Sequence, residues 1–187
     1  MKRISILLSL IWTLLAFCLS CKTIPVREVS ELEKRYTTIV LRNFSLEGAD
    51  IQTGGIAKAQ AYVEKLPEYF TGFVEKHLRQ GRRMRGLFDN IVVEEPGETK
   101  TYEGALILEG RFTEFSYTRL KGVASIAAEW ELKDAKTNTV VRAFNGRRIV
   151  SSPLTGKTPG RCQGFGSDPC VKNLAGDVAL SVWESLR

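Results

Sequence analysis

The feature that most constrains the fold is a strict alternation of apolar and polar side chains along residues 123–133. Side chains that alternate in this way point to opposite faces of a β-strand. A strand with one apolar and one polar face belongs to an antiparallel sheet that is buried on one side and wet on the other. The apolar side carries Ala124, Ile126, Ala128, Trp130 and Leu132, and the polar side Ser125, Glu129, Glu131 and Lys133.

Four further strands are expected around this one. Residues 36–44 contain the consecutive apolar residues Ile39, Val40 and Leu41, which is typical of a strand in the interior of a sheet. Residues 88–95 form a second short strand, and residues 105–119 a long one before the alternating strand. After a tight turn at residues 134–138, residues 139–150 return as the last strand. Residues 45–55 and 151–166 are expected to be loops.

Two stretches have helical periodicity. The first covers residues 56–80, where Pro67 is expected to open a new helix and Gly81 to stop it. The second follows Asp168, which can cap it, and Pro169, which suits its first turn. The order is β-α-β-β-β-β-α, and two helices can cover one face of the sheet. We therefore predict an α+β fold, a two-layer sandwich with a mainly antiparallel sheet and both helices packed on one face.

The N-terminus predicts export and lipidation. Lys2 and Arg3 precede an almost entirely apolar run, residues 4–19, and Ser20 stands directly before Cys21. This layout resembles a bacterial lipoprotein signal peptide, although Cys18 stands where that pattern has Leu. The resemblance implies cleavage before Cys21 and lipidation of its thiol. The alternative is an uncleaved N-terminal anchor, although the run is shorter than the roughly 20 residues of a membrane-spanning helix.

This reading divides the chain into three parts: a signal peptide at residues 1–20, a charged tether at 21–35, and a single domain at 36–187. By the enterobacterial sorting rule, Lys22 after the cysteine favours the outer membrane over the inner one, with the domain in the periplasm or at the cell surface. Loss of Lys2 and Arg3 leaves 25 basic against 21 acidic side chains. This mild charge and the export signal both disfavour a nucleic-acid partner.

Cys162 and Cys170 remain after lipidation of Cys21, and in an oxidising compartment they are expected to form a disulfide. The alternatives are a reactive thiol or half of a metal site. The spacing is not Cys-x-x-Cys, and the only histidine, His77, is far away in the sequence, so we expect no metal.

Two segments carry a family resemblance. Asn43-Phe44 with residues 105–112 form one half, and residues 128–141 the other. Together they resemble small envelope lipoproteins related to the curli secretion channel subunit and the N-terminal domain of TolB. Asn138 replaces the glycine usual in that turn, and Asn also tolerates φ > 0. The second segment also resembles auxiliary lipoproteins of lipid-transport ABC systems. No segment is left over to build a pore.

Three surface features could carry function. A basic cluster near the end of the first helix could contact anionic headgroups or acidic polymers, or be an ordinary solvated helix end. Phe165 could be a docking residue or pack under its own loop, and His77 is expected at the surface or core edge. The basic cluster consists of Lys76, Arg79, Arg82, Arg83 and Arg85.

No nucleophile, base and orienting group occur together, and no glycine-rich loop follows a strand into a helix. We therefore expect no enzyme, no catalytic residue and no cofactor. The sequence predicts a lipid-anchored accessory or assembly protein that binds an envelope protein or itself. The alternative is a lipid- or glycan-binding component of an envelope transport system.

Overall fold

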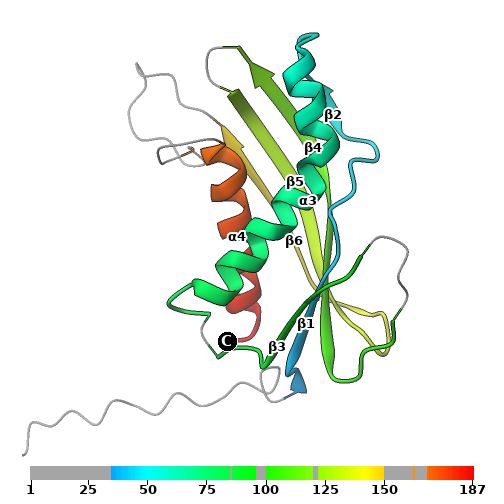
Figure 1. Cartoon of the computed structure of the whole chain (residues 1–187). Helices are drawn as coiled ribbons and strands as arrows, with labels where there is room; N and C mark the ends of the chain where they lie inside the picture. The colour runs from blue at the N-terminus through cyan, green and yellow to red at the C-terminus, as the bar shows by residue number, and fades with distance from the viewer. Residues whose placement is uncertain (1–34, 85, 96–99, 120–121, 150–161, 163–167) are drawn as a thin grey trace, which may run out of the picture.

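The computed structural model describes residues 35–84, 86–95, 100–119, 122–149, 162 and 168–187. In these residues two helices pack on one face of a six-stranded sheet (Figure 1). The two-layer α+β fold predicted from the sequence is confirmed. The strands are β1 (Thr38–Leu41), β2 (Asp50–Gln52), β3 (Asn90–Val93), β4 (Ala105–Thr118), β5 (Gly122–Asp134) and β6 (Val140–Ile149).

The sheet is mixed, because its antiparallel part is confined to three strands. The path is β3-β1-β4-β5-β6, and only β4–β5 and β5–β6 pair antiparallel. Strand β1 lies between β3 and β4 and is parallel to both. Its three buried residues Ile39, Val40 and Leu41 match the prediction of an interior strand. The expected loop at residues 45–55 contains β2, which pairs parallel with residues 114–116 of β4.

Helix α3 (Ala57–Gln80) is continuous, so the expectation that Pro67 opens a new helix is wrong. Val63 and Leu66 before the proline, and Phe70 and Val74 after it, form one buried stripe. Burial of this stripe against the sheet keeps both halves in one helix, although proline removes one internal hydrogen bond. The helix ends at Gly81, whose φ of −61° is not left-handed.

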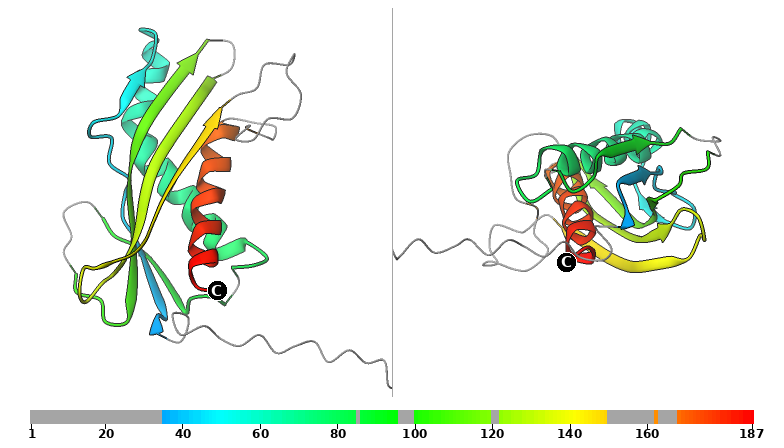
Figure 2. Two further views of the ribbon diagram at one scale, coloured as in Figure 1. Left: turned by 180° about the vertical axis from the view of Figure 1, so that it is seen from behind. Right: turned by 90° about the horizontal axis from the view of Figure 1, so that it is seen from below.

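Helix α4 (Pro169–Ser185) begins with proline at its first position, as predicted. Asp168 stands at the N-cap position, but its side chain makes no capping hydrogen bond and its φ is 58°. The residue therefore turns the chain in the left-handed region instead of capping it, which corrects the sequence expectation. Figure 2 shows α3 and α4 crossing on the same side of the sheet.

The core lies between this helical layer and the sheet. Phe112 of β4 is fully buried between Phe44 and Phe70, with ring centroids 5.8 and 5.1 Å away. Trp130 of β5 donates its indole N–H to Ser181 Oγ of α4 at 2.8 Å. Gly110 is required beside this cluster, since a Cβ there would lie 2.5 Å from both Glu129 O and the Phe44 ring. The apolar side of the alternating strand therefore faces the helices from Ile126 onward, as predicted, whereas Val123 takes the place expected for Ala124 in the core.

The turn between β5 and β6 is organised by the buried carboxylate of Asp134. It accepts hydrogen bonds from the backbone N–H groups of Lys136 (3.0 Å) and Thr137 (2.9 Å), and from the Tyr36 hydroxyl (2.7 Å). These bonds, led by that from the Thr137 N–H, lower the pKa of Asp134 from 3.8 to about 2. Asn138 has φ 54°, which confirms that asparagine supplies the left-handed position of the turn.

We expect Asp134 to make stability depend on pH in the acid range. Its pKa is lower in the folded chain, so its stabilisation is complete above about pH 4 and is lost as pH falls towards 2. A shift of this size corresponds to about 2 kcal/mol. Urea unfolding from pH 2 to 7 should show that Asp134→Asn removes most of this acid-range slope. Asp89→Asn, at an exposed position, is the control; equal slopes in wild type and Asp134→Asn would contradict the prediction.

Candidate functional site

The face of the sheet opposite the helices, which we call the open face, carries the polar side of each long strand. Glu109 and Arg111 of β4, Glu129 and Glu131 of β5, and Asn145 of β6 have this orientation, because their neighbours along each strand face the helices. Among the described residues, no helix lies on this side (Figure 2). The polar half of the alternation therefore forms a surface over β4 to β6, beside a small buried apolar cluster of Val40, Ala105 and Ile107 on the same side of the sheet.

A chain of ion pairs crosses the open face. Arg42, which directly follows β1, joins Glu94 after β3 to Glu109 of β4, with the Glu109 contact at 2.9 Å. Lys133 of β5 then lies 2.6 Å from both Glu109 and Glu131. The five charges alternate in sign across four strands. Each of these five side chains is therefore held by one or two neighbours of opposite charge.

The pKa directions follow from these contacts. Hydrogen bonding to Glu94 is the main reason why the pKa of Arg42 is raised. Burial alone would raise the pKa of Glu109, but the hydrogen bonds from Lys133 and Arg42 outweigh it and lower that pKa. Hydrogen bonding to Glu109 raises the pKa of Lys133. All three groups are therefore held in their charged forms.

Glu94 is the most constrained member of the chain. Its side chain is only 4% exposed, and its Oε1 atom has no hydrogen-bond partner among the described residues. A buried carboxylate of this kind depends on its one cation, Arg42, for compensation. The ion-pair chain is thus anchored at its buried end, while its other end at Glu131 faces the solvent side of the sheet.

The open face is hollowed above this chain, with a volume of about 690 Å³. A hollow of this size could hold a small polar ligand or a side chain of a partner. The lining is mixed, because Gly110, Trp130, Ala143 and Phe144 contribute to it beside the charged and amide residues. An acyl chain would desolvate the polar part of the lining without replacing its hydrogen bonds. The lining includes Arg42, Asn43, Ser45, Glu109, Arg111, Glu129, Glu131 and Asn145.

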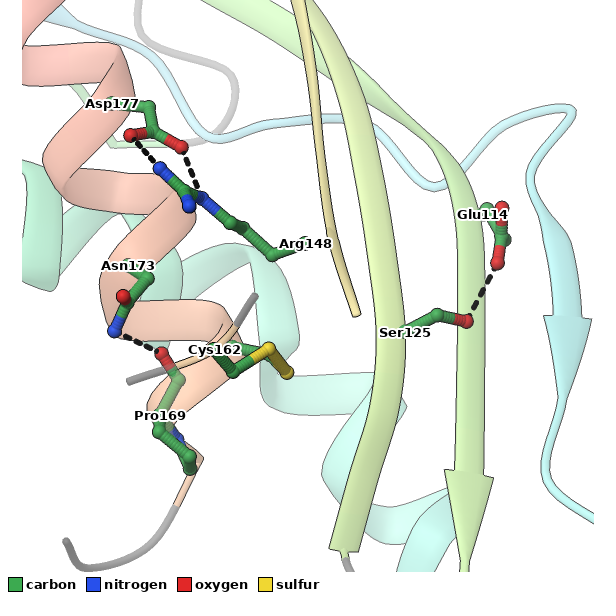
Figure 3. The surroundings of a disulfide bond; sticks show 8 residues. Glu114, Ser125, Arg148, Cys162, Pro169, Asn173 and Asp177 are labelled. Atoms are coloured by element: carbon green, nitrogen blue, oxygen red, sulfur yellow. Dashed lines mark hydrogen bonds and ion pairs between the residues drawn. A yellow bond between two sulfur atoms is a disulfide. The ribbon is translucent and has the colours of Figure 1, made fainter. Parts of the chain in front are cut away.

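A second hollow, of about 350 Å³, lies on the helical side between β6 and α4. Arg148 of β6 forms a two-pronged ion pair with Asp177 of α4 (Figure 3). Arg147, also of β6, forms an ion pair with Glu114 of β4, on the other side of β5, at 2.9 Å. Glu184, which is exposed, has no ion pair with any other described residue. It therefore leaves one uncompensated negative charge at this hollow.

The structure joins Cys162 and Cys170 by a disulfide, with their Cα atoms 4.6 Å apart. Cys170 is fully buried in the first turn of α4, and the Cys162 N–H donates to Ile149 O at 3.0 Å. The bridge thus fastens the start of α4 to the end of β6, near the Asn173 side chain that bonds Pro169 O (Figure 3). Its position suggests a structural role.

Reduction of this disulfide should lower stability by about 2–3 kcal/mol, because it reopens a short loop in the unfolded chain. The loop closed by the bridge spans a sequence separation of 8. Urea unfolding of the wild-type chain with and without reductant measures the effect. The double substitution Cys162→Ala and Cys170→Ala is the control, and its stability should not respond to reductant. A count of two free thiols in the unreduced mature chain would contradict the pairing.

The basic residues predicted near the end of α3 lie away from the open face. Arg79 pairs with Glu75 at 2.9 Å and donates to Ile91 O. Arg83 lies over the Trp183 ring, 5.2 Å from its centroid. Lys76 and Arg82 are exposed. Two members of the cluster thus have structural contacts within the chain, which favours the interpretation as a helix end over a dedicated anionic site.

Other predicted residues are placed as follows. His77 is exposed on α3, and its ring lies beside Gly176 of α4. Arg85, Phe165 and the lipidation residue Cys21 lie outside the described residues. Sequence reasoning pointed to neither Arg42 nor Glu94 as a site residue, and Glu94, expected in a solvated acidic turn, is buried. The two residues lie 52 positions apart, and nothing in their local patterns shows that they meet. The polar half of the alternation did point to Glu129, Glu131 and Lys133.

Among the described residues, no group of three or more His, Cys, Asp and Glu side chains could hold a metal ion. In the same residues, no helix combines the length and the apolar character needed to cross a bilayer.

Comparisons with known proteins do not assign a family. No family model matches the chain, and no curated protein matches it. A variant PelC dodecamer from Paraburkholderia phytofirmans is 14% identical, with a TM-score of 0.48 over 81% of this chain and 90% of that one. A putative neuraminyllactose-binding hemagglutinin homologue from Helicobacter pylori is 10% identical, with a TM-score of 0.42 over 87% and 89%.

A protein from Xanthomonas campestris assigned to the DUF330 family is 12% identical, with a TM-score of 0.40 over 79% of this chain and 84% of that one. With all three TM-scores below 0.5, these likenesses place the chain in no family. The resemblance to the curli secretion and TolB proteins stays a prediction.

Proposed function

We propose that this chain is a lipid-anchored, non-enzymatic accessory protein of the bacterial cell envelope that acts by binding. The binding partner is an envelope protein or a second copy of the chain. One observation carries the binding role: both helices of the described residues cover the same face of the sheet, and in that part of the chain the opposite face, with its hollow and its ion-pair chain, has no helical layer. Charges held in fixed positions on an accessible face can give a partner of complementary charge a specific orientation.

The anchor is proposed from the sequence at Cys21, where two or three acyl chains would give stable attachment. The domain would then face the periplasm or the cell surface from the outer membrane. Intact-mass measurement of the chain isolated from membranes tests this proposal. We expect a mature N-terminus at Cys21 with the mass of its lipids. An unmodified N-terminus at any other residue would refute the anchor.

Crosslinking followed by pull-down from intact envelopes tests the binding role. We expect a specific protein, or the chain itself, to be recovered with wild type and to be reduced by Cys21→Ala, which removes the anchor. Arg111→Trp should also reduce recovery, because it fills the hollow from an exposed position. Lys58→Trp, on the exposed side of α3, is the matched control. Recovery of lipid without any protein would reject the proposal.

The second candidate is binding of a glycan, which the charged and amide side chains in part of the lining of the hollow support. The side-chain amides of Asn43 and Asn145 offer both donors and acceptors to sugar hydroxyls. Calorimetric titration with cellotetraose and chitotetraose tests this candidate. Binding that Arg111→Trp abolishes and Lys58→Trp leaves intact would support it, and absence of heat with both probes would reject it.

A further inference from the structure

The outer edge of β6 is a ten-residue strand edge that faces away from the rest of the sheet. The Cys162 N–H donates to Ile149 O, so the peptide group of Ile149 points away from β5. Alternate residues of a strand direct their peptide groups to opposite sides. The N–H and C=O groups of Ala143, Asn145 and Arg147 therefore also point outward, and none has a backbone partner among the described residues.

Among the described residues, this edge lacks most of the features that keep strand edges from pairing, and its one bulge lies at Val141, before the regular part of the strand. Natural edges are shortened, bulged, covered, or guarded by charges and proline. Strand β6 is long and contains no proline. Two of its three arginines form ion pairs within the same chain, Arg147 with Glu114 and Arg148 with Asp177. Only Arg142 is exposed without an ion pair to another described residue.

We propose that β6 pairs antiparallel with β6 of a second copy, across a two-fold axis at Phe144. Only odd-numbered residues expose outward peptide groups, which restricts the alignments that can form hydrogen bonds. An axis at Asn145 would place Arg142 opposite Arg148 of the other copy, which opposes like charges. An axis at Phe144 instead places Arg142 opposite Gly146, and Ala143 opposite Asn145. This alignment opposes no two arginines.

The side chains on the helical side of β6 fit the same alignment. Arg142, Phe144 and Gly146 share this side, since their β5 partners Leu132, Trp130 and Ala128 face the helices. Trp130 and Leu174 fill the space directly above Gly146, where a Cβ would lie 2.8 and 3.1 Å from them. Arg142 of one copy would thus pass along the outer side of Gly146 of the other, towards the hollow between β6 and α4. Within the described part of the chain, Glu184 is the carboxylate at this hollow that has no ion pair. The unpaired Arg142 of one copy would therefore meet the unpaired Glu184 of the other.

The two Phe144 rings meet at the axis. Each Phe144 is half-buried and stacks on its own Trp130, with ring centroids 6.0 Å apart. Side chains of directly opposed residues are closest in pairs that do not share hydrogen bonds, and Phe144 is in such a pair at the axis. An aromatic cross-strand pair stabilises the pairing of two strands. The anchor favours this contact further by concentrating copies at one membrane.

Sedimentation velocity of the full chain in detergent tests the pairing. We expect wild type to form a dimer. Arg142→Glu and Glu184→Arg should each weaken dimerisation about tenfold, which corresponds to about 1.4 kcal/mol, and the double substitution should restore it. Both positions are exposed, so circular dichroism should show folded variants. Lys58→Glu is the control with the same charge change away from β6, and its dimer should match wild type.

A second variant tests the backbone pairing itself. Asn145→Pro removes an outward N–H from an edge position, where proline is tolerated, and should abolish the dimer while the chain stays folded. A wild-type chain that is monomeric at every concentration overturns the inference. So does a dimer that is unaffected by Asn145→Pro, or one that the double charge exchange fails to restore.

This inference rests on the proposed binding role but not on the anchor, since the Cys21→Ala chain should also dimerise in solution. The two can fail separately. A monomeric chain that still recovers an envelope protein overturns the β6 pairing alone, whereas a dimer that recovers only lipid from envelopes leaves the pairing and rejects the accessory role.

Discussion

Substitution of Arg42 by Met should destabilise the chain by about 3 kcal/mol, measured as the free energy of unfolding in urea. Arg42 is the cation that the carboxylate of Glu94 contacts, and the Glu94 side chain is 4% exposed. Methionine keeps much of the side-chain volume but leaves this carboxylate buried without a counter-charge. Removal of one member of a buried pair costs more than the pair contributes, because the remaining charge stays desolvated.

Two further variants separate the charge effect from packing. The double substitution Arg42→Met and Glu94→Gln removes the orphaned charge and should recover a large part of the loss. Arg111→Met removes a cation from the same face, but its partner Glu129 is 51% exposed. Exposed pairs of that kind contribute about 0–1 kcal/mol, so this control should be nearly neutral. Equal losses for Arg42→Met and Arg111→Met would show that Glu94 does not depend on Arg42.

The parts of the fold that sequence reasoning found are those with a local periodic signal. The alternation at 123–133 located β5, which spans Gly122–Asp134, and the helical stripes located α3 and α4. Burial explains this success, since each pattern reflects which side chains must avoid water. Where no side chain is buried, the pattern disappears. Strand β2 consists of three exposed residues and is held only by backbone pairing with β4, so its sequence carries no such signal.

Strand order and register could not be predicted from the sequence for a different reason. The parallel pairs of β1 with β3 and β4 form between segments that are distant in the chain, and no turn residue specifies them. The ion-pair chain depends on those pairs, because Arg42 reaches Glu94 and Glu109 only when β1 lies between β3 and β4. Alternation could place Glu131 and Lys133 on the polar face of their strand, but it could not show which residues of other strands would pair with them.

Pro67 illustrates how tertiary packing overrides a local rule. Proline usually begins a helix or breaks it, and this preference is worth about 3 kcal/mol in a helix interior. Val63 and Leu66 precede Pro67, and Phe70 and Val74 follow it, all on one buried face. Burial of such side chains is worth about 1.5–3 kcal/mol each, so a continuous helix costs less than exposing half of the stripe.

The second large effect is expected at Phe112, whose replacement by alanine should cost about 3–5 kcal/mol. Its ring is fully buried in β4, and it packs against Phe44 next to β1 and Phe70 of α3. Alanine would remove the contact shared by the sheet and the helical layer. The surrounding rings could not close the space, because Phe44 also packs edge-on against Phe70, with centroids 4.8 Å apart.

Urea unfolding of Phe112→Ala measures this loss, and Phe112→Leu gives the matched comparison. Leucine fills most of the volume, so its cost should be well below that of alanine. Phe144→Ala offers a contrast on the same side of the sheet, since Phe144 is only half-buried and contacts a single aromatic ring, Trp130. It should cost less than Phe112→Ala. If the two alanine variants lost equal stability, the cluster of Phe44, Phe70 and Phe112 would not be what joins the two layers.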